Sequence, residues 1–230
     1  VVVAFRMLPE VVWRMPKLGT FNLHASLLPN YRGAAPINWA IINGETKTGV
    51  TTFFIDDKID TGAMILSSEI EIGANENAGH LHDRLMQLGS KTVIETLSII
   101  EKGNVITTIQ EDKNPIKTAH KLDKENCKID WSKSGAEICN LIRGLSPYPS
   151  AWCFFSDGNQ EWNIKIYEAE FKKEQQTLTI GEIVSTKKEL KIAVKDGFMK
   201  ILSLQFPGKK RMDSNELLNG MDFSKIINAL

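Results

Sequence analysis

Residues 20–55 read TFNLHASLLPNYRGAAPINWAIINGETKTGVTTFFI, and this stretch decides the fold class. Polar and apolar residues alternate over 20–25, which predicts a strand. A loop rich in proline and glycine follows, and residues 36–42 predict a helix. The β-branched and aromatic residues of 48–55 predict a second strand. Strand, loop, helix and strand in this order indicate a layered α/β domain.

The flanking sequence extends this pattern in both directions. The apolar run at residues 1–5 predicts a strand buried on both faces of a parallel sheet, and residues 63–72 predict another strand. Apolar residues recur at helical spacing over 77–101, with Gly89 as a weak point. The apolar positions of this helix are Leu81, Leu85, Leu88, Val93, Leu97 and Ile100. We therefore expect a doubly wound, Rossmann-like sheet over residues 1–106.

The second half of the chain predicts another kind of domain. Residues 107–124 are mostly polar and lack a long period, so we expect a linker there. Ser134 and Glu137 have the spacing of a capping box, which predicts the start of a helix. Strand candidates separated by turns follow at 151–155, 162–169, 178–184, 190–194 and 198–206. Five short strands predict a small β-barrel domain over 125–230.

Composition narrows the function classes. The chain carries 28 basic and 28 acidic residues, so no general basic field is present to hold a nucleic acid. The three cysteines form no C-x-x-C pair, which argues against a disulfide framework or a zinc site and fits a reducing cytoplasm. The sequence contains no apolar run of membrane-spanning length. We therefore expect a cytoplasmic, metal-free protein without a membrane partner, and we expect a monomer.

Three polar residues form a candidate catalytic set. Asn22 and His24 share one face of the first strand, and Asp60 lies in the loop after the next strand. In a parallel sheet, loops beyond the carboxyl ends of the strands build the site. An amide and an imidazolium can stabilise the oxyanion formed when an amine attacks an acyl group, and a carboxylate can orient the imidazole. Spacing alone, however, favours a structural pair of polar residues on a strand.

A longer motif changes this interpretation. The N-x-H pair at Asn22 and His24, the SLLPNYRGAAP stretch at 26–36 and the D-T-G at 60–62 resemble the folate-dependent formyltransferase family. The resemblance implies that Asn22, His24 and Asp60 are the catalytic triad and that 10-formyltetrahydrofolate is the formyl donor. The residues that it implies for folate binding are Ser26, Leu27, Leu28, Pro29, Asp56, Asp57 and Ile59.

The resemblance also implies what precedes and follows this motif. Members of the family carry additional residues before the first strand, so we expect the catalytic domain to be N-terminally incomplete. Residues 4–9 depart from the family, because Arg6 stands near a position where many relatives have glycine. The second domain is expected to be a barrel that resembles an OB-fold.

The second domain indicates the acceptor. Residues 128–152 and 202–220 resemble the formyltransferases that act on methionine carried by initiator tRNA. Related enzymes act on amino sugars of sugar nucleotides, and this acceptor stays an alternative, as does an inactive fragment that at most binds RNA. The candidate tRNA contacts are Arg32, Arg143, Lys209, Lys210 and Arg211. Arg32 could also be a structural partner, and the basic run at 209–211 could be a solvated turn.

Overall fold

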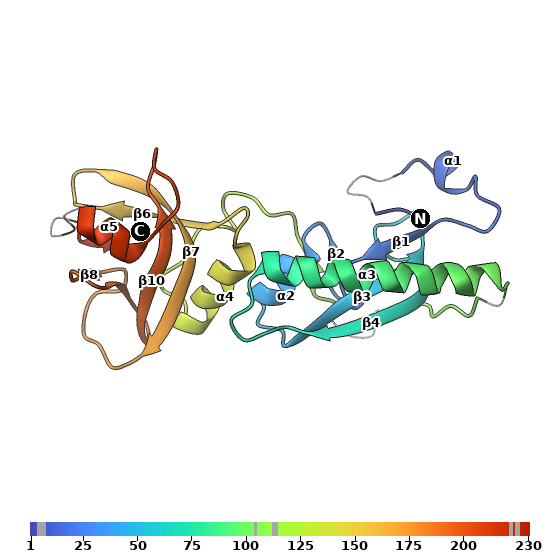
Figure 1. Cartoon of the computed structure of the whole chain (residues 1–230), viewed down its shortest axis with the longest axis horizontal. Coiled ribbons are helices and arrows are strands. Elements are labelled where there is room, and N and C mark those ends of the chain that lie inside the picture. The colour runs from blue at the N-terminus through green and yellow to red at the C-terminus, as the bar shows by residue number, and fades with distance from the viewer. Residues whose placement is uncertain (4–7, 104, 112–114, 221–222, 224–225) are drawn as a thin grey trace. The chain divides into compact units, whose positions relative to one another are not determined.

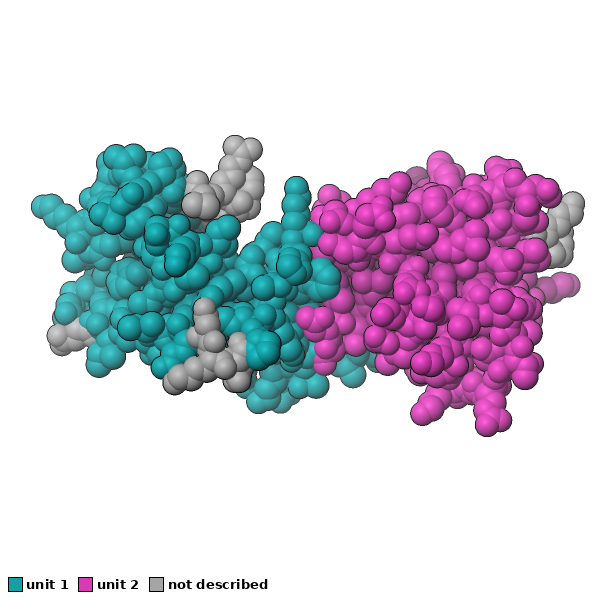
Figure 2. Space-filling model, turned by 180° about the vertical axis from the view of Figure 1, so that it is seen from behind, with its two compact units in different colours: residues 1–41, 45–121 teal, residues 42–44, 122–230 magenta. Residues whose placement is uncertain are grey.

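The computed structural model describes residues 1–3, 8–103, 105–111, 115–220, 223 and 226–230. The chain divides into two compact units, the first formed by residues 1–41 and 45–121 and the second by residues 42–44 and 122–230 (Figure 2). The expected strand at 1–5 falls partly outside the described residues, and Arg6 falls outside them entirely.

The first unit is built on a three-stranded sheet among the described residues. Its order is β1 (Phe21–His24), β3 (Lys47–Phe54) and β4 (Met64–Glu71), and both pairs are antiparallel. The long helix α3 (Ala78–Glu101) runs along this sheet (Figure 1). The α/β class is therefore confirmed. A parallel sheet was expected, but neither of these two strand pairs is parallel. A parallel contact to this sheet is the isolated bridge between Val2 and Asn22.

Three short elements complete the first unit. Helix α1 spans Glu10–Trp13, and helix α2 spans Pro36–Ile42, as the sequence predicted for the latter. Strand β2 (Arg32–Gly33) pairs in parallel with β5 (Thr118–Ala119). Ala119 is buried, so part of the segment expected as a linker packs into the first unit.

Helix α3 is continuous through Gly89, which corrects the expected weak point. Asn77 caps its first turn, accepting a 2.9 Å hydrogen bond from the His80 amide. A Cβ at position 89 would lie 2.7 Å from Leu23 Cδ2, so the glycine allows the helix to approach β1 closely. The buried face of α3 also includes threonines, because Thr96 can exchange a hydrogen bond with Thr52 of the sheet. Leu97, expected on the apolar face, is 39% exposed.

The second unit is a nearly closed antiparallel barrel. Its strand order is β12–β6–β7–β10–β9–β8, and β11 pairs with β10. These strands span Ala151–Ser156 (β6), Glu161–Lys173 (β7), Ile183–Ser185 (β8), Leu190–Val194 (β9), Gly197–Gln205 (β10), Met212–Asp213 (β11) and Asn228–Ala229 (β12). The Ile183 amide donates to the Ile227 carbonyl at 2.8 Å, which joins the two ends of this order. The predicted barrel is confirmed, with β7 longer and β8 shorter than expected.

Two helices accompany the barrel. Helix α4 (Gly135–Leu145) starts with the predicted capping box between Ser134 and Glu137, and it buries Ile138, Ile142 and Leu145 in the barrel core. Helix α5 (Ser214–Gly220) follows β11. Within the described residues, no helix is long and apolar enough to cross a membrane.

Candidate active site

Strand β1 presents Asn22 and His24 to a cavity of about 740 Å³ in the first unit. The two residues point to the same side because side chains alternate along a strand. His24 is only 7% exposed, whereas Asn22 is half-buried. Among the described residues, the Asn22 side chain has no hydrogen-bond partner, so its N–H groups are free for a molecule in the cavity.

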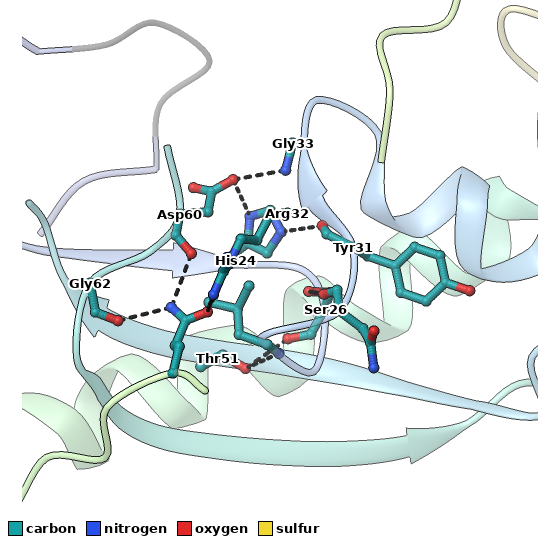
Figure 3. Close-up of polar contacts among 11 residues, drawn as sticks. His24, Ser26, Tyr31, Arg32, Gly33, Thr51, Asp60 and Gly62 are labelled. Atoms are coloured by element: carbon teal, nitrogen blue, oxygen red, sulfur yellow. Dashed lines mark hydrogen bonds and ion pairs between the residues drawn. The ribbon is translucent and has the colours of Figure 1, made fainter. Parts of the chain in front are cut away.

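Both nitrogens of His24 face oxygen atoms (Figure 3). Nε2 lies 2.8 Å from the carbonyl oxygen of Tyr31, and Nδ1 lies 3.6 Å from Oδ2 of Asp60. Because a carbonyl oxygen can only accept a hydrogen bond, Nε2 carries a proton in this arrangement. Nδ1 is therefore the nitrogen that can exchange a proton with a substrate.

The loop after β3 brings Asp60 to His24 by folding back. In the antiparallel register, Phe54 at the end of β3 lies opposite Phe21 at the start of β1, one strand length from His24. The expectation that two parallel strands end side by side is therefore wrong here. The loop returns toward the other end of β1, where the Gly33 amide donates to Asp60 Oδ2 at 2.9 Å.

Backbone conformation and close packing hold this returning loop. Asp60 has a φ of +56°, a left-handed conformation that a non-glycine residue rarely adopts. The Phe54 amide donates to the Ala63 carbonyl at 3.0 Å. A Cβ at Gly62 would lie 1.7 Å from the carbonyl oxygen of Phe54, so this turn requires glycine.

Gln110 is a residue of this site that the sequence reasoning missed. Its Nε2 donates to the carbonyl oxygens of Asp60 at 2.9 Å and Gly62 at 2.8 Å. Its Oε1 accepts from Arg32 Nε at 3.0 Å and Nη2 at 2.8 Å. Gln110 lies in the polar segment expected to be a linker, and no local pattern there marks one glutamine as a partner of Asp60.

The predicted folate-binding residues divide into two groups. Asp56, Asp57 and Ile59 line the cavity together with Asn22 and His24. The apolar part of the lining includes Leu8, Pro9, Trp13, Phe53 and Ile55. A largely apolar cavity of this volume with a few polar groups suits a drug-sized organic ligand.

Ser26, Leu27, Leu28 and Pro29 form the second group and do not line this cavity. The Thr51 hydroxyl donates to the Ser26 carbonyl at 2.7 Å, and the Leu28 amide donates to the same hydroxyl oxygen at 3.2 Å. These bonds through Ser26 and Leu28 fix the turn that follows His24. Their contact with folate stays a prediction.

The turn after His24 is also anchored through Tyr31. Its hydroxyl donates to Glu45 at 2.6 Å, and Glu45 forms an ion pair with Lys117. Burial opposes the charged form of Glu45, but the hydrogen bonds from Lys117 and Tyr31 outweigh burial and lower the pKa of this carboxyl. The Tyr31 side chain is thus anchored to the ion pair of Glu45 and Lys117. This anchor helps to fix the position of Tyr31, whose carbonyl accepts from His24.

The candidate tRNA-binding residues differ in their surroundings. Arg32 donates to Gln110, and Arg143 donates from Nε to Asn140 at 2.9 Å. Arg211 pairs with Glu168 at 2.7 Å and lies over the Tyr167 ring. Lys209 and Lys210 are exposed, and neither ammonium has an ion-pair partner within the described part of the chain.

The three cysteines are not part of the unit that contains this site. All of them belong to the second unit, and burial raises the pKa of the Cys127, Cys139 and Cys153 thiols. A thiol with a raised pKa is a weak nucleophile at neutral pH. The described site therefore offers an amide, an imidazole and a carboxylate beside a cavity, a set suited to transfer of an acyl group to an external amine.

Comparison with known proteins identifies the family of this chain. Residues 1–97 match the family model "Formyl transferase", and residues 121–222 match "Formyl transferase, C-terminal domain". A protein named methionyl-tRNA formyltransferase from Flavobacterium johnsoniae is 75% identical over 97% of this chain, which spans 71% of that relative. The protein of the same name from Bacteroides thetaiotaomicron is 51% identical over 97% of the chain and 71% of its own length.

Solved structures show the same fold. HypX from Aquifex aeolicus in complex with tetrahydrofolic acid has a TM-score of 0.70 at 20% identity, covering 96% of this chain and 38% of that one. The N-formyltransferase from Helicobacter canadensis, in complex with folinic acid and dTDP-3-aminofucose, has a TM-score of 0.62 at 25% identity. It covers 79% of this chain and 64% of its own. Given the family models and the close relatives, this chain belongs to the methionyl-tRNA formyltransferases of the formyl transferase family.

Proposed function

We propose that this protein transfers the formyl group of 10-formyltetrahydrofolate to the α-amino group of methionine on initiator tRNA. The observation that carries the proposal is the meeting of Asn22, His24 and Asp60 at one cavity, in a chain 75% identical to a relative named for this activity. The cytoplasm, where initiator tRNA is charged, is the proposed location.

The proposed reaction begins when the neutral methionyl amine attacks the formyl carbon. A carbon–nitrogen bond forms, and the formyl oxygen becomes an oxyanion. Asn22 lines the cavity, and its side-chain N–H groups have no partner among the described residues, while protonated His24 can supply a second donor through Nδ1. Donors fixed in place before the reaction stabilise developing negative charge without reorganisation.

The second half of the reaction breaks the bond between the formyl carbon and N10 of the folate. The attacking nitrogen loses a proton, and N10 gains one as tetrahydrofolate leaves. Nδ1 of the His24 imidazolium can donate its proton to N10 and then accept the proton that the attacking nitrogen loses, because Nε2 stays bound to the Tyr31 carbonyl. Asp60, 3.6 Å from Nδ1, orients the ring and stabilises its charged form.

The folate is proposed to occupy the cavity through its flat ring system. The walls around Trp13, Phe53 and Ile55 provide apolar area, and the segment with Asp56, Asp57 and Ile59 provides backbone and side-chain polar groups. The second unit is proposed to hold the tRNA, with Lys209 and Lys210 as phosphate contacts.

Replacement of His24 by Ala tests the proposed mechanism. Turnover with formyl donor and methionyl initiator tRNA is expected to fall at least about a hundredfold, the scale of a lost acid–base group. Near-normal turnover would remove His24 from the mechanism.

A second assay tests the acceptor. The wild-type protein receives either charged initiator tRNA or an amino-sugar nucleotide, together with the same formyl donor. Formylation of the tRNA substrate is the expected result. Faster formylation of the amino sugar would favour the sugar-nucleotide alternative, and no transfer to either acceptor would contradict the proposed activity.

A further inference from the structure

Gln110 connects the loop of Asp60 to the segment of Arg32. One amide nitrogen donates to two backbone carbonyls, those of Asp60 and Gly62, at 2.9 and 2.8 Å. The amide oxygen accepts two bonds from the Arg32 guanidinium, at 3.0 and 2.8 Å. Both N–H groups of the amide and its oxygen are therefore in use.

The orientation of this amide is fixed by its neighbours. A guanidinium has donors only, so Oε1 must face Arg32, and Nε2 must then face the two carbonyls. The two bonds from Nε2 hold the backbone directly after the left-handed residue, because one acceptor is the carbonyl of Asp60 itself, which has a φ of +56°, and the other is the carbonyl of Gly62. A conformation of this kind persists only where its surroundings determine it.

The same segment also holds the other partner of the catalytic histidine. The Tyr31 amide donates to the Lys117 carbonyl at 2.5 Å, and the Ala34 amide donates to the Ala119 carbonyl at 2.7 Å. Tyr31 accepts from His24, and Gly33 donates to Asp60. Gln110, Lys117 and Ala119 therefore contact the two loops that approach the imidazole.

We propose that Gln110 is a positioning residue that sets the Asp60 carboxylate against Nδ1 of His24. It acts through the backbone carbonyls of Asp60 and Gly62, on the C-terminal side of the residue that carries the carboxylate. This inference deepens the proposed function and rests on it. Misplacement of a catalytic group by about 1 Å can lower turnover about a hundredfold.

The variant Gln110→Glu tests this role with little change in shape. A carboxylate can still accept from Arg32, but its second oxygen would face the carbonyl oxygens of Asp60 and Gly62 without a proton to donate. We expect kcat to fall between about tenfold and a hundredfold. The KM for methionyl initiator tRNA should stay within about twofold, because lost transition-state positioning lowers kcat and leaves acceptor binding alone.

Gln176→Glu is the matched control. Gln176 Nε2 donates to the Val194 carbonyl at 2.8 Å, and its Oε1 accepts from the Leu178 amide at 2.6 Å. The substitution removes the same kind of bond in the second unit. Its kcat should equal that of the wild type, even where its melting temperature falls as far as that of Gln110→Glu.

Three outcomes separate the hypotheses. If wild-type protein turns over and Gln110→Glu has the kcat of Gln176→Glu, or if only KM rises, the positioning role is wrong while the proposed function stands. If the wild type transfers no formyl group to methionyl-tRNA, the proposed function itself fails.

Gln110→Met, which carries no charge, is measured if Gln110→Glu is unfolded. A loss of kcat at unchanged KM in this variant supports the positioning role, and a wild-type kcat overturns it.

Discussion

The Nδ1 atom of His24 lies 3.6 Å from Oδ2 of Asp60, and the same carboxylate oxygen accepts a 2.9 Å hydrogen bond from the Gly33 amide. The opposite ring nitrogen of His24 donates to the Tyr31 carbonyl. The imidazole is thus held between a carboxylate and a carbonyl, and each of these acceptors is fixed by its own backbone contacts. Because these acceptors are fixed in place, the imidazolium does not have to reorient when negative charge develops on a substrate.

Removal of the Asp60 charge is the first prediction. Asp60→Asn keeps the size of the side chain and an oxygen for the Gly33 amide, but no charge remains beside Nδ1. We expect kcat for formyl transfer to fall by about a hundredfold or more, the scale of a disabled acid–base pair. Steady-state kinetics with charged initiator tRNA measures this.

A surface pair of the same composition is the control. His82 Nδ1 lies 3.1 Å from Asp83 Oδ1 on helix α3, and both side chains are more than half exposed. Asp83→Asn should leave kcat unchanged. Equal kcat for Asp60→Asn and Asp83→Asn would contradict the proposed role of Asp60.

Gly62 gives the second prediction. A Cβ in Gly62→Ala would lie 1.7 Å from the Phe54 carbonyl oxygen, so the loop must move and Asp60 must move with it. We expect a destabilisation of about 1–3 kcal/mol, as for other overpacked sites. For a chain of this length, that corresponds to a fall in melting temperature of about 2–4 °C for each kcal/mol.

The comparison with Gly220 isolates the loop effect. Among the described residues, nothing outside its own helix and its chain neighbours lies within 4 Å of a Cβ built at position 220, at the end of helix α5, so Gly220→Ala should melt at or above the wild-type temperature. Gly62→Ala should lose kcat as well as stability, because the displaced loop carries Asp60. A stable and fully active Gly62→Ala protein would contradict the described turn.

Local patterns in the sequence predicted most elements because each pattern has a local cause. Alternation predicted β1, the capping box of Ser134 and Glu137 predicted the start of α4, and turn residues separated the barrel strands. The helix bounds of α2 agree with the expected 36–42. The motif also pointed to Asn22, His24 and Asp60, and the structure places all three beside one cavity.

The contacts that were missed join residues far apart in the chain. Gln110 is 50 residues from Asp60, and no periodicity links them. The antiparallel pairing of β1 and β3 also has no local signal, because parallel and antiparallel strands share the same alternation. Leu97 was expected to be buried, but α3 turns Thr92 and Thr96 toward the sheet, where their hydroxyls find partners on β3 and β4.

Glu45 gives the third prediction, which concerns pH. Its folded-state pKa lies below the ordinary value of 4.5, since hydrogen bonds from Lys117 and Tyr31 outweigh the opposing effect of burial. A lowered pKa means that the charged carboxylate stabilises the fold above pH 4.5 and that this stabilisation is lost as pH falls through the lowered value. Glu45→Gln should therefore melt below the wild type at pH 7, and the difference should shrink as pH falls from 4.5.

Glu95 provides the comparison for this pH series. It is exposed on helix α3 and has no ion-pair or hydrogen-bond partner through its side chain among the described residues. Thermal melts of Glu95→Gln between pH 3 and pH 7 should follow the wild type throughout, within about the effect of a surface substitution. A gap between wild type and Glu45→Gln that is constant with pH would exclude charge as the source of stability.

The last prediction concerns the exposed lysines of the second unit. Lys209 and Lys210 follow β10 and are free of ion pairs within the described residues, whereas Arg211 is tied to Glu168 at 2.7 Å. If the two lysines contact phosphates, the double variant Lys209→Gln/Lys210→Gln should raise the KM for charged tRNA. It should also reduce the slope of log KM against log salt concentration by up to about two, one for each lost contact. At saturating tRNA, kcat should stay unchanged because neither residue lies at the described cavity.

The double variant Lys187→Gln/Lys188→Gln is the control. These two lysines are exposed in the turn between β8 and β9, so their replacement removes the same charge from the same unit and should leave the slope closer to that of the wild type. Equal slopes for the two double variants would mean that the tRNA responds to the net charge of the unit, and the phosphate contact at positions 209 and 210 would then be wrong.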